Sequence, residues 1–240
     1  MSAAWLLGAV VILAAHFVFG LAGFGVGLVA MAFLPFIMSP AQAVVLMTVY
    51  AMIFAVVLFV PLRRDVTPRA IVGLVVGSLL GTPAGVWILV VASASVLSRL
   101  IGLMLVVVVA LELAGRLPRR FEARGWGLGA GILAGLIGGA VGLPGPPIII
   151  YATTRGWSPR TFKANLQAFF IVNQTVTVIG YWVAGLLTAE VIRLTASYFI
   201  PASLGIGVGM ALFNRVDATC FRRIVFLVLL AAGVLLLVGG

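Results

Sequence analysis

The chain has 240 residues, of which 64% are hydrophobic and only 8% charged, and its mean hydropathy is +1.31. A soluble domain is usually about 45–50% apolar and about 25% charged, so this composition cannot cover a water-facing surface. It excludes a soluble enzyme, a disordered chain and a nucleic-acid-binding protein, and it predicts an integral membrane protein. The net charge of +10 agrees with this, because most of the basic residues cluster in short gaps between apolar stretches, as in cytoplasmic loops.

Eight hydrophobic stretches are candidates for membrane segments. A helix that crosses about 30 Å of hydrocarbon at about 1.5 Å per residue needs about 20 apolar residues. The stretches cover about 4–34, 41–62, 70–91, 95–114, 126–152, 162–184, 190–211 and 220–239. The most polar gap between them is the segment RLPRRFEARG at 115–124. We therefore predict an all-α polytopic membrane protein with about eight hydrophobic segments.

The two halves of the chain share landmarks in the same order, which predicts an internal repeat. The matching segments are Gly20–Leu28 with Gly135–Leu143, Ser39-Pro40 with Ser158-Pro159, Leu80–Gly85 with Leu204–Gly209, and Leu97–Arg99 with Phe221–Arg223. We assign a first membrane repeat to 1–115, a basic cytoplasmic linker to 116–125 and a second membrane repeat to 126–240.

Glycines and prolines interrupt the first and fifth stretches, at 20–27 and 135–147. Pro-Gly-Pro-Pro at 144–147 cannot continue an ordinary helix, because proline lacks the N–H donor and clashes with the preceding turn. Irregular backbone at membrane depth is tolerated only inside protein or beside a water-filled cavity. Paired broken helices in corresponding positions of two halves indicate the binding site of a transporter. Small-residue helix packing is the alternative, and we assign it to the GxxxG pairs Gly81/Gly85 and Gly205/Gly209.

The basic residues distinguish two topologies. If every stretch crosses the membrane once, 8 basic residues lie on one side and 7 on the other. If stretch 126–152 enters and leaves by the same face, the division becomes 13 against 2, as expected when the basic side is cytoplasmic. We therefore favour inverted repeats that each open with a glycine-broken, re-entrant segment. One long tilted helix in each of these stretches is the alternative.

The two-repeat layout resembles the sulfite exporter TauE/SafE family of membrane permeases. The resemblance rests on Gly20–Leu28 in the first half, and on Gly135–Pro147 followed by a basic loop and a polar sixth stretch in the second. It covers nearly the whole chain, about 4–239. It implies a secondary transporter, and in particular an exporter, of small sulfur-containing or organic anions such as sulfite or sulfonates. It also implies a multi-pass protein of the bacterial cell (inner) membrane.

Backbone at the two breaks and polar side chains of the sixth stretch are the candidate binding groups, with the site between the two halves. N–H groups at a half-helix N-terminus carry about half a positive charge and bind anions. In the sixth stretch Lys163, Gln167, Gln174 and Thr177 fall within about one quadrant at 100° per residue, whereas Asn165 and Asn173 point elsewhere. Inter-helix hydrogen bonding is the alternative role of these side chains. The predicted substrate-binding residues are Gly23, Gly25, Gly27, Gly138, Gly142, Pro144, Gly145, Pro146, Gln167, Gln174, Thr48 and Thr177.

Few residues of the chain suit catalysis, redox chemistry or ion coupling. No carboxylate lies in the middle of a stretch, and the only histidine, His16, is either a packing residue or a proton shuttle. No nucleotide, metal or nucleophile motif is present, and the single Cys220 excludes an intramolecular disulfide. We predict no enzymatic activity, no cofactor and no metal. The expected partners are a small anion and the lipid bilayer, without nucleic acid, and a homodimer is one candidate assembly. An anion channel on the same scaffold is the alternative function.

Overall fold

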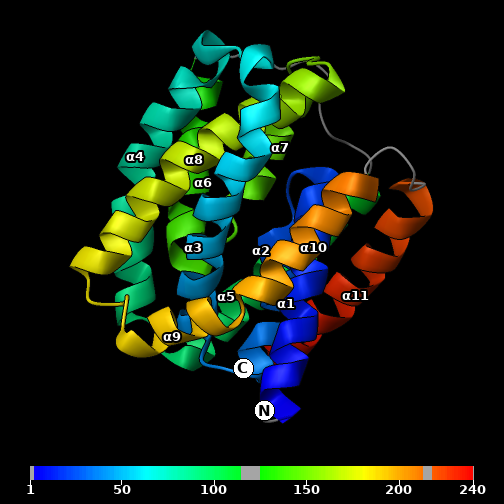
Figure 1. Cartoon of the computed structure of the whole chain (residues 1–240). Coiled ribbons are helices and arrows are strands. Elements are labelled where there is room, and N and C mark those ends of the chain that lie inside the picture. Colours follow the sequence, from blue (N-terminus) through cyan, green and yellow to red (C-terminus); the bar gives the residue numbers. More distant parts are fainter. Residues whose placement is uncertain (1–2, 115–124, 213–217, 240) are drawn as a thin grey trace. The chain divides into compact units, whose positions relative to one another are not determined.

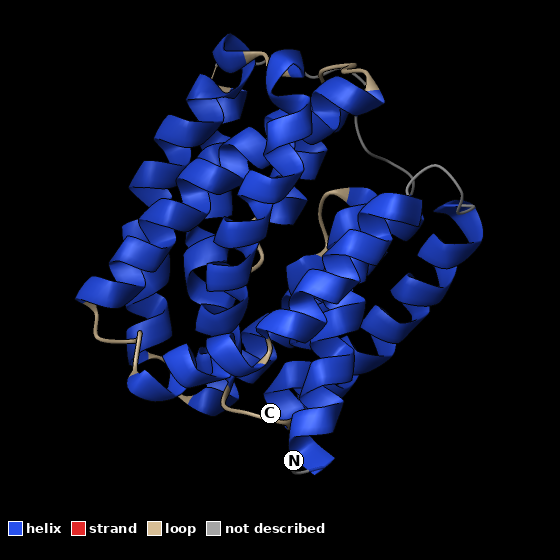
Figure 2. Ribbon diagram, in the orientation of Figure 1, coloured by secondary structure: helices blue, strands red, loops and turns tan. Residues whose placement is uncertain are grey.

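The computed structural model of the chain describes residues 3–114, 125–212 and 218–239, with side chains described for 3–111, 125–212 and 229–239. Within these ranges every regular element is a helix, as the sequence predicts (Figure 2). The helices are α1 (Ala3–Ala22), α2 (Val26–Phe33), η1 (Leu34–Phe36), α3 (Pro40–Phe59), η2 (Val60–Asp65), α4 (Pro68–Val91), α5 (Ala94–Ala114), α6 (Trp126–Val141), α7 (Gly145–Thr153), α8 (Pro159–Val183), α9 (Ala189–Ser197), α10 (Phe199–Leu212) and α11 (Ala218–Gly239) (Figure 1). The predicted linker at 116–125 lies outside the described residues except for Gly125.

Five described helices are long and apolar enough to cross a membrane, namely α1, α3 continued by η2, α4, α5 and α8. The bent pair α9 and α10, with 48° between the two helices, makes a sixth if it is counted as one span. The chain is thus a multi-pass α-helical membrane protein. All eight predicted stretches contain helix, but only five or six segments meet this test in the described part of the chain. The first and fifth stretches each contain two helices where one long tilted helix was the alternative.

Proline marks where three of the long helices begin. Pro40, Pro68 and Pro159 are the first residues of α3, α4 and α8. Proline suits this position, because its φ is already helical and the N–H that it lacks would have no partner within the helix. These prolines therefore predict where the three helices begin.

The chain divides into two compact units, and each unit combines helices from both halves of the sequence. Unit 1 comprises Met1–Met47, Ala92–Leu113 and Leu187–Gly240, and unit 2 comprises Thr48–Val91 and Ala114–Leu186. One boundary falls inside α3, between Met47 and Thr48. These units are defined by packing, so the repeats that we assign by sequence similarity, at 1–115 and 126–240, stay a prediction.

In unit 2, helices α4, α6 and α8 run in the same direction (Figure 1). A Cβ built on Gly77, Gly81 or Gly85 of α4 would collide with a backbone carbonyl of α6. Each later glycine of α4 meets a later carbonyl of α6, so the two helices are parallel. Helices α4 and α8 also lie side by side in the same direction. Thr67, directly before α4, contacts Asn165 near the start of α8, and Thr82 of α4 contacts Asn173 further along α8. This close backbone approach is the small-residue packing expected of membrane helices.

Helices α6 and α7 form an antiparallel pair. The end of α7 therefore lies at the same end of unit 2 as the start of α6. A Cβ on Gly127, in the first turn of α6, would lie 3.3 Å from the ring of Tyr151 near the end of α7. The Tyr151 hydroxyl donates to the carbonyl of Ala70, in the first turn of α4, at 2.7 Å. At the opposite end of α6, Pro144 lies over Gly138. Residues 126–153 therefore form a helical hairpin.

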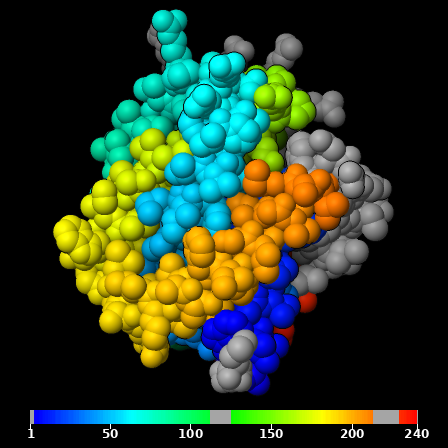
Figure 3. All heavy atoms as spheres, viewed as in Figure 1, coloured from blue at the N-terminus to red at the C-terminus, as the bar shows by residue number. Residues whose placement is uncertain are grey.

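In unit 1, helices α1 and α10 lie side by side and also run in the same direction (Figure 1). Gly8 faces Tyr198, Gly205 faces Leu13, and Gly209 faces Phe17. Helices α9 and α10 form much of one visible surface (Figure 3). The large apolar side chains that α10 exposes are Phe199, Ile200, Leu204, Val208 and Met210. Such a surface suits contact with lipid.

Helix ends in the first half recur 119 positions later. Helix α1 ends at Ala22 and α6 at Val141, α2 begins at Val26 and α7 at Gly145, and α3 begins at Pro40 and α8 at Pro159. The sequence comparison aligns Gly20–Leu28 with Gly135–Leu143, which differs from this register by one helical turn. In the structural register Gly23 corresponds to Gly142 and not to Gly138.

Candidate functional site

The first break lies between α1 and α2 in unit 1. Gly23 has a φ of +81° and donates its N–H to the Phe19 carbonyl at 2.7 Å, which caps α1. Gly25, with a φ of +89°, is the residue from which α2 starts, and left-handed backbone of this kind favours glycine. The first three residues of α2, Val26–Leu28, are buried, and their N–H groups have no carbonyl partner within the helix. The break therefore carries three backbone donors in a buried position.

The second break lies between α6 and α7 in unit 2. Gly142 has a φ of +71° and donates its N–H to the Gly138 carbonyl at 2.9 Å, in the same capping geometry as Gly23. The first three positions of α7 are Gly145, Pro146 and Pro147. The two prolines have no N–H, so Gly145 supplies the only backbone donor of these positions. The second break is therefore poorer in donors than the first.

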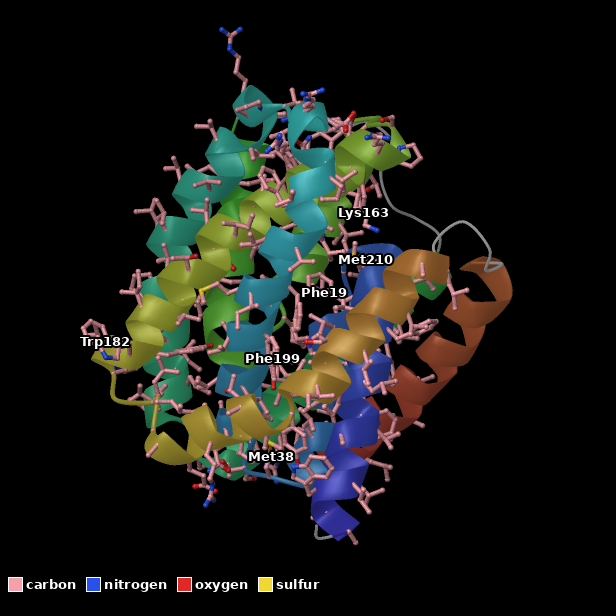
Figure 4. All side chains as sticks on the ribbon, in the orientation of Figure 1. Phe19, Met38, Lys163, Trp182, Phe199 and Met210 are labelled. Carbon is pink, nitrogen blue, oxygen red and sulfur yellow. The ribbon has the colours of Figure 1, made fainter. Side chains whose placement is uncertain are left out.

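Five polar residues along α8 are buried, namely Asn165, Gln167, Asn173, Gln174 and Thr177, as a role in binding or in helix packing requires. Gln167, Gln174 and Thr177 of the predicted stripe are all buried, and Lys163 is partly buried. Figure 4 shows Lys163 near the start of the helix. Thr177 donates its hydroxyl to the backbone carbonyl of Asn173 at 2.8 Å. Its one donor is thus used within α8, which favours a structural role for this residue.

Asn173 lies at the second break, although its spacing along α8 places it outside the predicted stripe. Its side chain is fully buried, and a Cβ built on Gly138 would lie 3.5 Å from its Oδ1 and 2.9 Å from the Pro144 Cβ. The Asn173 Nδ2 donates to the Thr82 Oγ1 at 3.4 Å. No protein group within the described residues donates to the Asn173 Oδ1.

Tyr181 ties α8 to the end of α6. Its buried hydroxyl donates to the Gly139 carbonyl at 2.8 Å and lies 3.4 Å from the Gly138 carbonyl. The side chain of Thr48, a predicted site residue, hydrogen-bonds this same hydroxyl. Thr48 is therefore placed next to the last turn of α6 through Tyr181, which sequence reasoning did not select.

The basic residues described in unit 2 gather at one end of it. Arg160 forms an ion pair with Asp65 at 2.7 Å, and the Arg155 guanidinium lies 4.7 Å from the centre of the Tyr151 ring. The basic residues near this end are Arg63, Arg64, Arg69, Arg155, Arg160 and Lys163. Trp182 lies at the opposite end of α8 from Lys163 (Figure 4) and is exposed, as an interfacial anchor would be.

His16 is buried within unit 1, beside α10. Its Nδ1 lies 2.7 Å from the Ile12 carbonyl. A carbonyl only accepts hydrogen bonds, so this nitrogen carries the proton and donates it. A Cβ on Gly205 of α10 would lie 3.1 Å from the His16 Cβ. The position suits the packing role that was one of its two predicted alternatives.

Two acidic side chains are described, and both lie at helix ends. Asp65 ends η2, and Glu190 is in the first turn of α9. Glu112, Glu122, Asp217 and Cys220 fall outside the described side chains. Among the side chains that the structure describes, no three His, Cys, Asp or Glu residues gather where they could hold a metal ion.

Comparison with known proteins identifies one family. A family model described as "Sulfite exporter TauE/SafE" matches residues 7–236, which include both helix breaks and the polar helix α8. Neither a curated protein nor a solved structure matches the chain. Because the match extends over nearly the whole sequence, the chain belongs to the sulfite exporter TauE/SafE family of membrane permeases.

Proposed function

We propose that the protein is a secondary transporter that exports small sulfur-containing or organic anions, such as sulfite or sulfonates, across the bacterial inner membrane. The observation that carries this proposal is the pair of helix breaks, each capped by a left-handed glycine, Gly23 or Gly142, at corresponding positions. Transporter folds bind substrates at paired discontinuous helices, where free backbone groups meet the substrate. Membership of a permease family supports transport as the activity.

We further propose that the two halves are inverted repeats and that α6–α7 is re-entrant. The start of α6, the end of α7 and the starts of α4 and α8 lie together at one end of unit 2, as Gly127, Tyr151, Ala70 and the Asp65–Arg160 ion pair attest. This supports a chain that enters and leaves by the same face. Concentration of basic residues at this end favours the cytoplasm as that face.

The α2 N-terminus is the better anion-binding group of the two breaks. Its N–H groups at Val26, Gly27 and Leu28 point along the helix axis away from α2, where the helix dipole is positive. In α7 the corresponding positions are Gly145, Pro146 and Pro147, and only one of them has an N–H. We infer that the negatively charged oxygens of the substrate bind at Val26–Leu28.

Gly27→Pro tests this assignment, because it introduces the residue found at the corresponding position of α7, Pro146. A hydrogen bond to a charged group contributes about 1.5–3 kcal/mol, so loss of the Gly27 N–H should weaken anion binding at least about tenfold. Gly27→Ala retains the N–H and adds only a methyl group, so the difference between the two variants isolates the donor. Equal affinities in the two variants would contradict the assignment.

Flux measurements in proteoliposomes test transport itself. Sulfite and sulfonate efflux should saturate with concentration, and external unlabelled substrate should accelerate exchange of labelled substrate. A channel on the same scaffold would instead give high unitary conductance without counterflow. Absence of any anion flux, with correctly inserted protein, would overturn the proposed function.

A further inference from the structure

We propose that the α6–α7 break binds a hydrogen-bond-donating group of the transported anion, so that the protein selects anions bearing a hydroxyl group or an acidic proton. The inference rests on the proposed function and specifies its substrate class. Its starting point is the buried Asn173 Oδ1 beside Gly138 and Pro144, to which no described protein group donates.

The amide orientation of Asn173 follows from its neighbour Thr82. The Thr82 hydroxyl donates its single proton to the Ser78 carbonyl at 2.7 Å, so its oxygen is left as an acceptor. The Asn173 side chain therefore turns its Nδ2 toward Thr82, at 3.4 Å, and its Oδ1 toward Gly138. Reversing the amide would place two acceptors against each other. The group presented to the break is thus an acceptor.

The surrounding backbone does not supply the donor that this oxygen lacks. Pro146 and Pro147 have no N–H, and the Gly142 N–H is used by the Gly138 carbonyl at 2.9 Å. On the same side of α8, the Thr177 hydroxyl donates to the Asn173 carbonyl at 2.8 Å, and the Tyr181 hydroxyl donates to the Gly139 carbonyl at 2.8 Å. An unsatisfied buried acceptor is costly, so a ligand that brings its own donor is favoured at this position.

A donor fits the break better than a metal cation does. Hard cations are held by several oxygen ligands, usually with a carboxylate among them. The described side chains provide no carboxylate at this break, and the Gly139 carbonyl is already an acceptor for Tyr181. One well-oriented amide oxygen instead matches one O–H group. A site that binds a hydroxyl group strongly rejects the analogue that lacks this hydroxyl. An apolar pocket rejects a ligand with an added hydroxyl much less strongly.

A matched pair of monoanions provides the test. 2-Hydroxyethanesulfonate and propanesulfonate have the same charge and nearly the same size, and they differ by a hydroxyl against a methyl group. We expect the purified full-length protein to bind the hydroxyl compound at least about tenfold more tightly, measured by titration calorimetry in sodium-free buffer. In the wild-type protein, equal affinities for the two compounds would overturn the inference.

Asn173→Leu removes the acceptor at nearly constant volume, and the ratio of the two affinities should then fall to about one. Thr175→Val is the control, because Thr175 lies on the same helix and, among the described residues, its hydroxyl bonds only the Ile171 carbonyl of α8. This variant should keep the wild-type ratio. A ratio that persists in Asn173→Leu, or a wild-type preference that appears only with sodium present, would contradict donor recognition by Asn173. Failure of both sulfonates and of sulfite to bind or to be transported would instead reject the proposed function.

Discussion

Glycines in this chain differ in what a side chain at the same position would meet. A Cβ on Gly81 would collide with the Ile132 carbonyl of α6, so that glycine permits helix packing. Gly142 lies in left-handed backbone, which costs other residues roughly 1–2 kcal/mol. At Gly145 the nearest atom to a new Cβ is the Ile149 Cδ1, at 3.9 Å. The first two glycines are therefore required by the fold, whereas the third is free to serve a ligand.

Alanine substitutions should separate these roles. Gly81→Ala should destabilise the protein by about 1–3 kcal/mol, the usual effect of overpacking, and lower its melting temperature in detergent. Gly145→Ala should leave the melting temperature near the wild-type value, and the bulkier Gly145→Leu should reduce transport in a protein that still folds. If Gly81→Ala melted like the wild type, close approach of α4 and α6 would not be what holds this part of unit 2 together.

The left-handed position Gly142 gives a second prediction at this scale. Asparagine tolerates left-handed backbone better than other residues with a side chain, so Gly142→Asn should be more stable than Gly142→Leu by about 1 kcal/mol. Gly142→Leu should also abolish transport while membrane insertion persists. Thermal unfolding and proteoliposome flux measure the two effects. Normal flux in Gly142→Leu would show that this glycine serves only to cap α6.

Sequence spacing predicts the break glycines better than it predicts the side chains around them. The left-handed glycines Gly23, Gly25 and Gly142 all belong to the predicted site. Asn173 was assigned to another face, although at 100° per residue it lies only about 40° from Thr177. Its proposed role in binding depends on Thr82 of α4 and Gly138 of α6, and no periodicity within α8 reveals which neighbours it meets.

Among the helices, the repeat register shows how a regular pattern misleads a sequence comparison. Gly131, Gly135 and Gly139 of α6 each face α4 at intervals of one turn. A comparison of glycines alone therefore still finds matches when it is displaced by four residues, because Gly20 and Gly23 pair with Gly135 and Gly138 in one register and with Gly139 and Gly142 in the other. The starts of α3 and α8 at Pro40 and Pro159 give a register that does not have this ambiguity, because proline is selected for one position of the helix.

Helix directions in unit 2 predict which loops share a side of the membrane. In a Cys220→Ser background, single cysteines at the exposed positions Arg64 and Thr153 should resist an impermeant thiol reagent added outside, because both lie at the basic end. Ala184→Cys, just beyond the other end of α8, should be labelled. Mass spectrometry of intact cells treated with the reagent provides the readout.

The same experiment distinguishes the two topologies. Labelling of Thr153→Cys from outside, with Arg64→Cys protected, would require α6–α7 to cross the membrane completely. That result would reject both the re-entrant hairpin and the inverted repeats. Protection of all three positions would show only that the reagent fails at Ala184, so permeabilised cells serve as the control for reactivity.

For the molecule as a whole, the composition already determines the class, whereas the assembly of the units depends on tertiary contacts. A composition of 64% hydrophobic and 8% charged residues indicates a membrane protein. The composition does not predict that Thr48–Val91 packs with Ala114–Leu186 in one unit. It arises because α4 meets α6 through carbonyl-to-glycine contacts, and such a match between two surfaces is not visible in either segment alone.

The distribution of charge over the whole chain predicts the driving force of the proposed export. A monovalent anion that leaves a cell with an inside-negative potential gains about 2.3 kcal/mol per 100 mV, or nearly fifty-fold in concentration ratio, and a divalent anion gains twice that free energy. The described acidic side chains lie at helix ends, and His16 donates to the Ile12 carbonyl of its own helix. We therefore expect efflux from proteoliposomes to follow a potassium–valinomycin potential, and to persist in His16→Gln and without a pH gradient. Efflux that ignores the potential but stops when the pH gradient is removed would instead require a coupled proton, and would make His16 the first residue to examine.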